Sequence, residues 1–174
     1  DLRGRAIEHV NKFIESFPPL DARSHPATES ATRWPVEGPI VFNSRVDLVM
    51  GKPEGRVSRK VIIDLKTGWV SPLHREDLRF YALIETLARD VPPRKLATFY
   101  LDSAQPMVED VSEGLLRSAL RRTLDGVHAI IELQIEGRTP VLRPGTHCRW
   151  CPLRDTCPES EADKSHDDGD ARDG

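Results

Sequence analysis

The stretch VIIDLKTG, residues 61–68, limits the fold of this 174-residue chain more than any other feature of its sequence. Its first residues are apolar and β-branched, and the run ends at Gly68, which is typical of a short buried strand. Side chains alternate between the two faces of a strand, so Asp64 and Lys66 point to one face and Leu65 to the other. A carboxylate in such a strand must be paired, hydrogen-bonded or bound to a cation.

The segments around this strand show helical and strand patterns, separated by proline and glycine. The expected helices span residues 2–17, 74–90 and 112–136, and the expected strands span residues 28–34, 40–50, 61–68 and 95–102. Elements in this order predict a mixed sheet with helices packed against it, which is an α/β fold.

Charge is distributed unevenly along the chain. The formal net charge is −3, but residues 159–174 hold seven acidic and two basic residues, which leaves the preceding part at +2. We expect one folded domain over residues 1–158 and a disordered acidic tail over residues 159–174. A mildly basic domain permits a nucleic-acid partner without requiring one.

The sequence shows neither a secretory signal nor an apolar run of the roughly 18–20 residues that a membrane span needs. Its three cysteines lie close together, which favours metal binding in a reducing compartment over a disulfide framework. We therefore expect a cytoplasmic protein with no membrane partner.

A second acidic residue, Asp47, interrupts the apolar strand that precedes the buried one. Adjacent strands of a hairpin can bring Asp47 close to Asp64. Two carboxylates and the ammonium of Lys66 leave a negative site that suits Mg²⁺ or Mn²⁺. A metal held in this way activates water and neutralises charge on a transferring phosphoryl group. The alternative is a purely structural ion pair between Asp64 and Lys66.

The helix expected at residues 74–90 adds polar groups. Asp77 and Tyr81 are four residues apart and share one face of the helix. Arg75 and Arg79 have the same spacing. We expect this helix to present polar groups to the metal site, and Arg75, Arg79 and Asp77 to contact DNA. The alternative is that Tyr81 belongs to the core and that the arginines form a solvated face.

Taken in order, RVDLVM, VIIDLKTG and EDLRFYALI resemble the RecB-like branch of the PD-(D/E)XK nucleases. That branch carries a helical histidine, a G-R-[VI]-D strand, a D-x-K-T-G strand and a Q-x-x-x-Y helix. The C-terminal C-x₂-C-x₅-C spacing is similar to that of its iron–sulfur members, the AddB-type helicase–nuclease subunits and the CRISPR-associated RecB-like exonucleases. The resemblance runs from His9 to Cys157. It implies a restriction-endonuclease-like core, with a mixed central β-sheet flanked by helices and a C-terminal Cys-rich metal staple.

The resemblance also implies a role for each matching residue. Asp47 and Asp64 correspond to the metal-binding carboxylates, and Lys66 corresponds to the catalytic lysine. His9, on the first helix, corresponds to the metal-binding histidine. The carbonyl of Leu65 corresponds to a further metal ligand.

Other positions match the family less uniformly. Tyr81 corresponds to the tyrosine of the helical motif and joins the predicted catalytic set. Asp77 stands where the family has glutamine, which bears on how this position contacts the substrate. Ser44 stands where the family has the glycine of G-R-V-D. Glu29 is a weaker match to the acidic residue that often precedes that strand.

The cysteines Cys148, Cys151 and Cys157 are compatible with two kinds of metal site. Together with His147 they supply the four ligands of a closed structural zinc site, although adjacent His147 and Cys148 would reach one ion only in strained geometry. Alternatively, they are three corners of a [4Fe–4S] cluster whose fourth ligand lies elsewhere. The resembling families place that fourth cysteine upstream of the nuclease motifs, which here means before Asp1. We favour the cluster in the intact protein.

These features predict a metal-dependent DNA nuclease that hydrolyses phosphodiester bonds with Mg²⁺ or Mn²⁺. The resemblance implies exonuclease action on single-stranded DNA or DNA ends, in DNA repair and recombination or in CRISPR spacer acquisition. It also implies a helicase subunit or CRISPR adaptation proteins as partners. The competing hypothesis is a non-catalytic DNA-binding or scaffold module of a helicase–nuclease complex.

Overall fold

The computed structural model describes residues 1–36 and 40–159. The chain divides into two compact units, Asp1–Gly126 and Val127–Gly174. The tail predicted over residues 159–174 lies, beyond its first residue, outside the described part of the chain. Within the described ranges, none of the helices is both long enough and apolar enough to cross a membrane.

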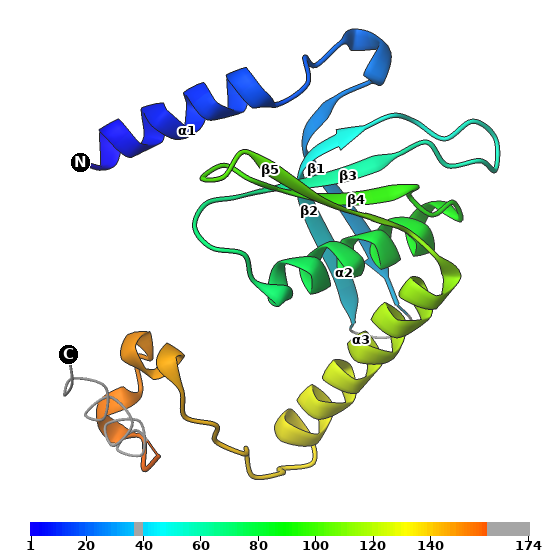
Figure 1. The fold of residues 1–174 in the computed structure, drawn as a ribbon. Coiled ribbons are helices and arrows are strands. Elements are labelled where there is room, and N and C mark those ends of the chain that lie inside the picture. The colour runs from blue at the N-terminus through cyan, green and yellow to red at the C-terminus, as the bar shows by residue number, and fades with distance from the viewer. Residues whose placement is uncertain (37–39, 160–174) are drawn as a thin grey trace. The chain divides into compact units, whose positions relative to one another are not determined.

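The first unit is built around a five-stranded sheet with the strand order β1-β2-β3-β4-β5 (Figure 1). The strands are β1 (Ala27–Pro35), β2 (Val41–Met50), β3 (Val61–Lys66), β4 (Lys95–Tyr100) and β5 (Gln105–Asp110). β3 and β4 are parallel and the other neighbours are antiparallel, so the sheet is mixed, as predicted. A parallel pair needs a crossover connection, which α2 provides here.

The α-helices of the described part are α1 (Leu2–Ser16), α2 (Pro72–Arg89) and α3 (Glu113–Gln134). α2 begins two residues earlier than predicted. The side chain of Ser71 caps it by accepting a hydrogen bond from the backbone N–H of Leu73 at 3.3 Å, and Pro72 occupies the first turn. The helix ends at Asp90, whose φ of 58° is in the left-handed region.

The sequence pattern did not indicate β5. This strand pairs with β4 at the edge of the sheet and contains Pro106, which a central strand would not accommodate. Its side chains are almost all exposed, so the apolar alternation that marks a half-buried strand is absent from it. The preceding turn depends on Ala104, whose φ of 55° is unusual for a residue with a Cβ atom.

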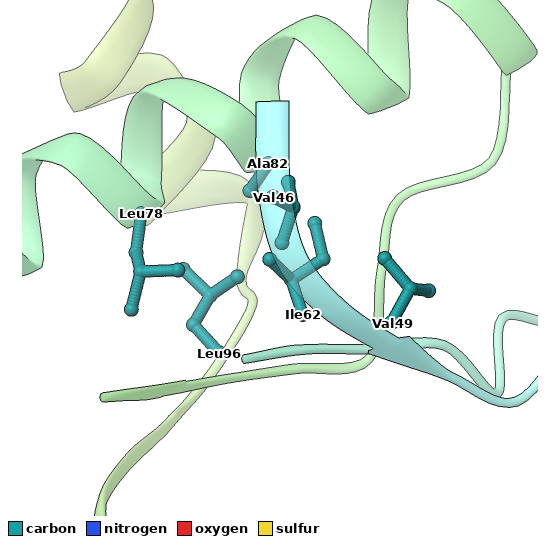
Figure 2. Close-up of a cluster of buried hydrophobic side chains, with 6 residues drawn as sticks. All are labelled: Val46, Val49, Ile62, Leu78, Ala82 and Leu96. Atoms are coloured by element: carbon teal, nitrogen blue, oxygen red, sulfur yellow. The ribbon is translucent and has the colours of Figure 1, made fainter. Parts of the chain in front are cut away.

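A core of buried apolar side chains fixes α2 to one face of the sheet (Figure 2). Its members are Val46, Val49, Ile62, Leu78, Ala82 and Leu96. Leu78 and Ala82 are four residues apart and therefore lie on one face of α2. Burying an aliphatic side chain of this size contributes about 1.5–3 kcal/mol relative to leaving it exposed. This core therefore determines where α2 holds its polar side chains relative to β3.

A second cluster lies on the opposite face, because Ile63 and Ile62 are neighbours in β3 and point to opposite sides. Its members are Leu48, Ile63, Ala97 and Phe99. The ring of Phe99 meets Phe13 and Phe17 edge-on, with centroids 6.1 and 5.2 Å apart. Every residue of α1 keeps some solvent exposure. The two phenylalanines are therefore the main apolar anchor of this helix.

A buried polar network connects α2 to β1 and to the start of β3. Glu85 is only 7% exposed. It accepts a hydrogen bond from Oγ1 of Thr32 at 2.9 Å and forms ion pairs with Lys60 and with Nε of Arg89, the latter at 2.8 Å. Burial by itself would raise the pKa of Glu85, but these three partners lower it below its ordinary value. The ionised carboxylate is thus the form that the fold stabilises.

Candidate active site

The carboxylate and the lysine of β3 lie together on the face of the sheet that α2 covers. Asp64 is 5% exposed, and its Oδ2 lies 2.8 Å from Nζ of Lys66. The alternation predicted for this strand is therefore confirmed. This contact lowers the pKa of Asp64 both through hydrogen bonding and through charge. A buried oxygen in this state retains acceptor capacity for a cation.

The protonation states of this pair follow from its surroundings. Burial raises the pKa of Asp64 above its ordinary value, and Lys66 offsets part of that shift. For Lys66, burial favours the neutral form, but the nearby acidic groups, Asp64 first, outweigh burial and raise its pKa. Lys66 is therefore an ammonium at neutral pH. It can offer positive charge and hydrogen bonds to a reacting group, but it cannot serve as a base.

Asp47 reaches the same place from β2. The antiparallel register pairs Leu48 with Ile63, so the next residue pair sets Asp47 opposite Asp64. Oδ2 of Asp47 accepts a hydrogen bond from the backbone N–H of Leu65 at 2.8 Å. The charge of Asp47 also contributes to the raised pKa of Asp64. The hairpin thus brings both carboxylates to one point of the sheet, and the metal-ligand role of the Leu65 carbonyl stays a prediction.

The pairing of β1 with β2 is interrupted at Glu29. Thr28 pairs with Leu48 and Ser30 with Val46, so the constant register sets Glu29 across from Asp47, although these two residues do not pair. Glu29 has a φ of 49°, is exposed, and forms a long ion pair with Arg45, with 4.0 Å between Nε and Oε2. Glu29, the weaker match to the family, therefore lies near the site, but its charged contact is with Arg45.

α2 contributes the two residues that share a helical face. Tyr81 is half-buried, and its ring packs against the core beneath α2. Burial, followed by the charges of Asp64 and Asp77, raises the pKa of the Tyr81 hydroxyl. Asp77 is exposed and also raises the pKa of Lys66. Asp47, Asp64, Lys66, Asp77 and Tyr81 therefore interact electrostatically, and we call these five residues the acid–lysine cluster.

β4 borders the acid–lysine cluster with buried polar residues that the sequence pattern did not single out. In the parallel register, Thr98 lies beside Asp64 and Tyr100 beside Lys66. They are 1% and 2% exposed. Nδ1 of His74, at the start of α2, lies 3.1 Å from Oη of Tyr100. His74 stands three residues before Asp77, and residues at this spacing share one face of a helix. This spacing was the signal that could have identified His74 as a neighbour of the site.

The arginines predicted to contact DNA are paired with acidic side chains. Nη2 of Arg75 and Nη2 of Arg79 lie 3.0 and 2.8 Å from Oε2 of Glu109 on β5. Nη1 of Arg79 also lies 2.9 Å from Oε1 of Glu76, which in turn pairs with Arg122 of α3. These contacts join α2 to β5 and α3 and neutralise much of the positive charge. Contact of the two arginines with DNA stays a prediction.

His9 does not group with Asp47 and Asp64, the two predicted metal ligands. Its Nε2 lies 3.1 Å from Oδ1 of Asp102, which follows β4, and its side chain is 15% exposed. Within residues 1–36 and 40–159, no three His, Cys, Asp or Glu side chains converge closely enough to hold a metal ion. The predicted grouping of His9 with Asp47 and Asp64 is therefore not formed here. Its role as a ligand stays a prediction.

The cysteines lie in the second unit, on two short 3₁₀ helices, η2 (Thr146–Trp150) and η3 (Arg154–Thr156). Cys148 lies in η2, and Cys151 and Cys157 directly follow the two helices. A turn hydrogen bond links Cys148 and Cys151, because the N–H of Cys151 donates to the carbonyl of Cys148 at 3.2 Å. Sγ of Cys148 also accepts a hydrogen bond from the N–H of Gly145 at 3.4 Å. All three cysteines are half-buried. The four-ligand zinc grouping with His147 is likewise not formed among the described residues.

Comparison with known proteins identifies the family of the chain. The sequence profile of the PD-(D/E)XK nuclease superfamily matches residues 2–158, which is nearly the whole described chain. The chain belongs to the PD-(D/E)XK nuclease superfamily. Membership implies an enzyme that hydrolyses phosphodiester bonds with divalent metal ions such as Mg²⁺. It also agrees with the restriction-endonuclease-like α/β fold of the mixed sheet and its flanking helices.

Solved structures of similar fold are distant in sequence. The crystal structure of SSO0001 gives a TM-score of 0.50 at 18% identity, covering 89% of this chain and 69% of that chain. A putative exonuclease from Eubacterium rectale gives a TM-score of 0.42 at 11% identity, covering 80% of this chain and 59% of that one. This PD-(D/E)XK chain thus spans less than two thirds of the second protein. No curated protein matches it.

The acid–lysine cluster of this PD-(D/E)XK chain fits the divalent ion that its superfamily uses. Asp64 is buried with the ammonium of Lys66 at its Oδ2, and Asp47 uses one of its two oxygens for the N–H of Leu65, so both carboxylates retain lone pairs. Mg²⁺ is commonly held by one or two carboxylates and keeps several waters. Two carboxylates that stand opposite each other on neighbouring strands therefore suffice as protein ligands.

Proposed function

We propose that this protein is a metal-dependent deoxyribonuclease. The observation that carries the proposal is the convergence of Asp47, Asp64 and Lys66, from two strands, at one place where Asp64 is buried and the other two side chains are half-buried. A structural ion pair between Asp64 and Lys66 would need no second carboxylate. Burial is the main cause of the raised pKa of Asp64, and the charge of Asp47 adds to it. Perturbed pKa values of this kind are typical of functional sites.

Asp47 and Asp64 are the protein ligands that would hold Mg²⁺ or Mn²⁺, with the Leu65 carbonyl as a further ligand. The bound ion supplies positive charge that activates water and offsets the charge of the phosphoryl group. Lys66, which stays protonated, donates to the phosphate oxygens or to the attacking water and stabilises the charge that develops. Water adds to phosphorus and one P–O ester bond breaks, giving a phosphate monoester and an alcohol.

The substrate that we propose is single-stranded DNA or a DNA end, cut in the manner of an exonuclease. The RecB-like order of motifs supports this proposal. DNA repair with a helicase subunit and spacer acquisition with CRISPR adaptation proteins are the two settings that the resemblance supports.

Purified protein incubated with 5′-labelled linear single-stranded and double-stranded DNA, and with internally labelled circular DNA, tests the function. We expect cleavage with Mg²⁺ or Mn²⁺ and none with EDTA, and linear DNA should be cut in preference to circular DNA. Metal-dependent cutting of circular DNA would show an endonuclease instead. DNA binding without any cleavage in either metal would support the scaffold hypothesis and overturn the nuclease assignment.

The arginines of α2 allow a prediction about DNA affinity. Glu109→Gln removes the charge that neutralises Arg75 and Arg79, so DNA should bind more tightly. Arg79→Ala should weaken binding to all sequences alike and reduce the slope of log K against log salt by about 1. Fluorescence anisotropy at several salt concentrations measures both effects. Arg117→Ala, which breaks an exposed pair with Glu113 on α3, serves as the control.

We further propose that Cys148, Cys151 and Cys157 bind a [4Fe–4S] cluster in the intact protein, with a fourth ligand from outside this set. Their spacing and their place on two consecutive 3₁₀ turns support a shared structural metal. Protein purified without oxygen should show broad visible absorption and bound iron and sulfide. Bound zinc without visible absorption would support the alternative site with His147 instead.

A further inference from the structure

The chain contains three tryptophans, and they differ in what lies against their rings. Trp34 on β1 stacks on Phe42, with ring centroids 6.2 Å apart and an interplanar angle of 3°. The ring of Trp150 lies under the guanidinium of Arg149, whose Cζ is 5.5 Å from the ring centroid. Trp69 is 86% exposed, and among the residues that the structure describes no ring or guanidinium packs on it. Its indole is therefore available for contact with another molecule.

Trp69 lies in the short segment that connects β3 to α2. It follows Lys66 by three residues, so the Cα atoms of these two residues are at most about 11 Å apart. Both ends of the segment are held, because the backbone N–H of Gly68 donates a hydrogen bond to Asp102 and the side chain of Ser71 caps α2. The backbone of Trp69 is thus kept near the ammonium of the acid–lysine cluster, while its ring remains exposed.

The exposure of Trp69 is part of a small apolar surface. A single exposed apolar residue is ordinary in a folded protein. Here the next residue, Val70, and Leu73 in the first turn of α2 are exposed as well. Apolar side chains that gather in this way mark a surface that binds a partner. The proposed substrate offers a matching group, because each unpaired nucleotide joins a base with apolar π faces to the phosphate backbone that Lys66 would contact.

We propose that Trp69 is a stacking platform for an unpaired base of the DNA strand bound at the acid–lysine cluster. This inference rests on the proposed nuclease function and deepens it, because it assigns a residue to the preference for single-stranded DNA. Aromatic side chains bind unpaired bases of any sequence, since every base has a π face. Bases inside a closed duplex already stack on their neighbours and have no free face to offer. Tryptophan also supplies a large, rigid ring, so little conformational entropy is lost on binding.

Affinity for single-stranded oligodeoxythymidylate, measured by fluorescence anisotropy in EDTA so that no DNA is cut, tests the proposal. Loss of an aromatic platform typically weakens binding about 5–150-fold. We expect a loss of this size in Trp69→Ala and Trp69→Leu, and affinity close to wild type in Trp69→Phe, because phenylalanine keeps a π face and leucine does not. Full affinity in Trp69→Ala would overturn the proposal. Equal affinity of the leucine and phenylalanine variants would show an unspecific apolar contact and would overturn it too.

Three controls separate stacking from an effect on the phosphate contacts. An abasic strand of the same length and a closed circular duplex should bind wild type and Trp69→Ala equally. The slope of log K against log salt should also be the same in both, because the indole neutralises no phosphate. Trp150→Ala, which removes the exposed tryptophan under Arg149, should keep wild-type affinity. A loss that appears equally with the abasic strand, or equally in Trp150→Ala, would contradict a stacking role specific to Trp69.

The fluorescence of Trp69 gives a second readout that does not depend on a change of affinity. In the double variant Trp34→Phe and Trp150→Phe, Trp69 is the one remaining tryptophan. We expect acrylamide to quench its emission in the free protein, and bound oligodeoxythymidylate to quench it and to shield it from acrylamide. An indole that is already shielded before DNA is added is covered by protein, and this result would overturn the proposal.

Cleavage assays distinguish the failure of this inference from the failure of the proposed function. Stacking on Trp69 without any cleavage in Mg²⁺ or Mn²⁺ would leave the platform in place and refute the nuclease function. Metal-dependent cleavage of single-stranded DNA with the same KM in wild type and Trp69→Ala would leave the nuclease function in place and overturn the platform.

Discussion

Replacing Asp64 or Lys66 by alanine is expected to abolish metal-dependent DNA cleavage while leaving the fold intact. In the proposed mechanism Asp64 would provide a ligand oxygen, and without it the ion would lose one of its two carboxylates. Lys66 provides the positive charge next to that ion, and removal of one such preorganised group typically lowers kcat about 10²–10³-fold. Cleavage rates with Mn²⁺ at saturating DNA measure both effects.

Two matched substitutions separate this effect from a general loss of charge. Lys95 and Asp110 form a lysine–aspartate pair of similar length, 2.6 Å, but on the exposed edge of the sheet at β4 and β5. Lys95→Ala and Asp110→Ala should therefore cleave DNA at the wild-type rate. Full activity in Asp64→Ala or Lys66→Ala would refute the assignment of the acid–lysine cluster as the catalytic site.

The buried carboxylate of Asp64 should destabilise the fold when no metal is bound. Because burial raises the pKa of Asp64 above its ordinary 3.8, folding favours the protonated form. The cost of burying its charge is fully present above the raised pKa and disappears as the pH falls below 3.8. Asp64→Asn should thus keep or raise the melting temperature in EDTA at pH 7, and its advantage over wild type should vanish in acid. A large loss of stability in Asp64→Asn would show that the ion pair with Lys66 is structural.

Glu85→Ala is expected to lower the free energy of unfolding by about 3–5 kcal/mol, because it leaves the charges of Lys60 and Arg89 beside an emptied buried site. The hydroxyl of Thr32 loses its acceptor in the same step. Thermal and urea unfolding, followed by circular dichroism, measure the loss. Glu113→Ala, which removes an exposed carboxylate paired with Arg117, should change stability by less than about 0.5 kcal/mol.

The contribution of Glu85 should also depend on pH. Its pKa is lowered below the ordinary 4.5, since its three partners outweigh burial. A lowered pKa in the folded state means that the stabilisation is complete above pH 4.5 and is lost as the pH falls through the folded-state pKa. The difference in stability between wild type and Glu85→Gln should therefore be constant near neutrality and shrink below pH 4.5. A difference that grows in acid would contradict this interpretation of the network.

The strand β3 was predictable because its evidence is local. The β-branched apolar run of residues 61–63 predicts a buried strand, and the period of two places Asp64 and Lys66 on one face, which the 2.8 Å ion pair confirms. The helical spacing of Asp77 and Tyr81 likewise predicted one face of α2. Both inferences rest on backbone geometry that a few neighbouring residues determine.

The edge strand and the polar networks were not predictable in this way. β5 carries an internal proline and exposed side chains, and it exists because β4 offers it an unpaired edge. Glu85 resembles any other acidic residue of an amphipathic helix until Thr32, fifty-three positions earlier, becomes its partner. Neither feature leaves a periodic signal, because each depends on which distant segment packs against it.

The sequence by itself determined the class of the fold and the chemistry: a mixed sheet with helices, two acidic residues and a lysine on adjacent strands, and three closely spaced cysteines. Only the tertiary structure decided how these groups meet. The register of β2 and β3 sets Asp47 opposite Asp64. The turn after β4 places Asp102 beside His9 of α1. Periodicity fixes the face on which a side chain lies, but register and packing between distant segments fix its partner.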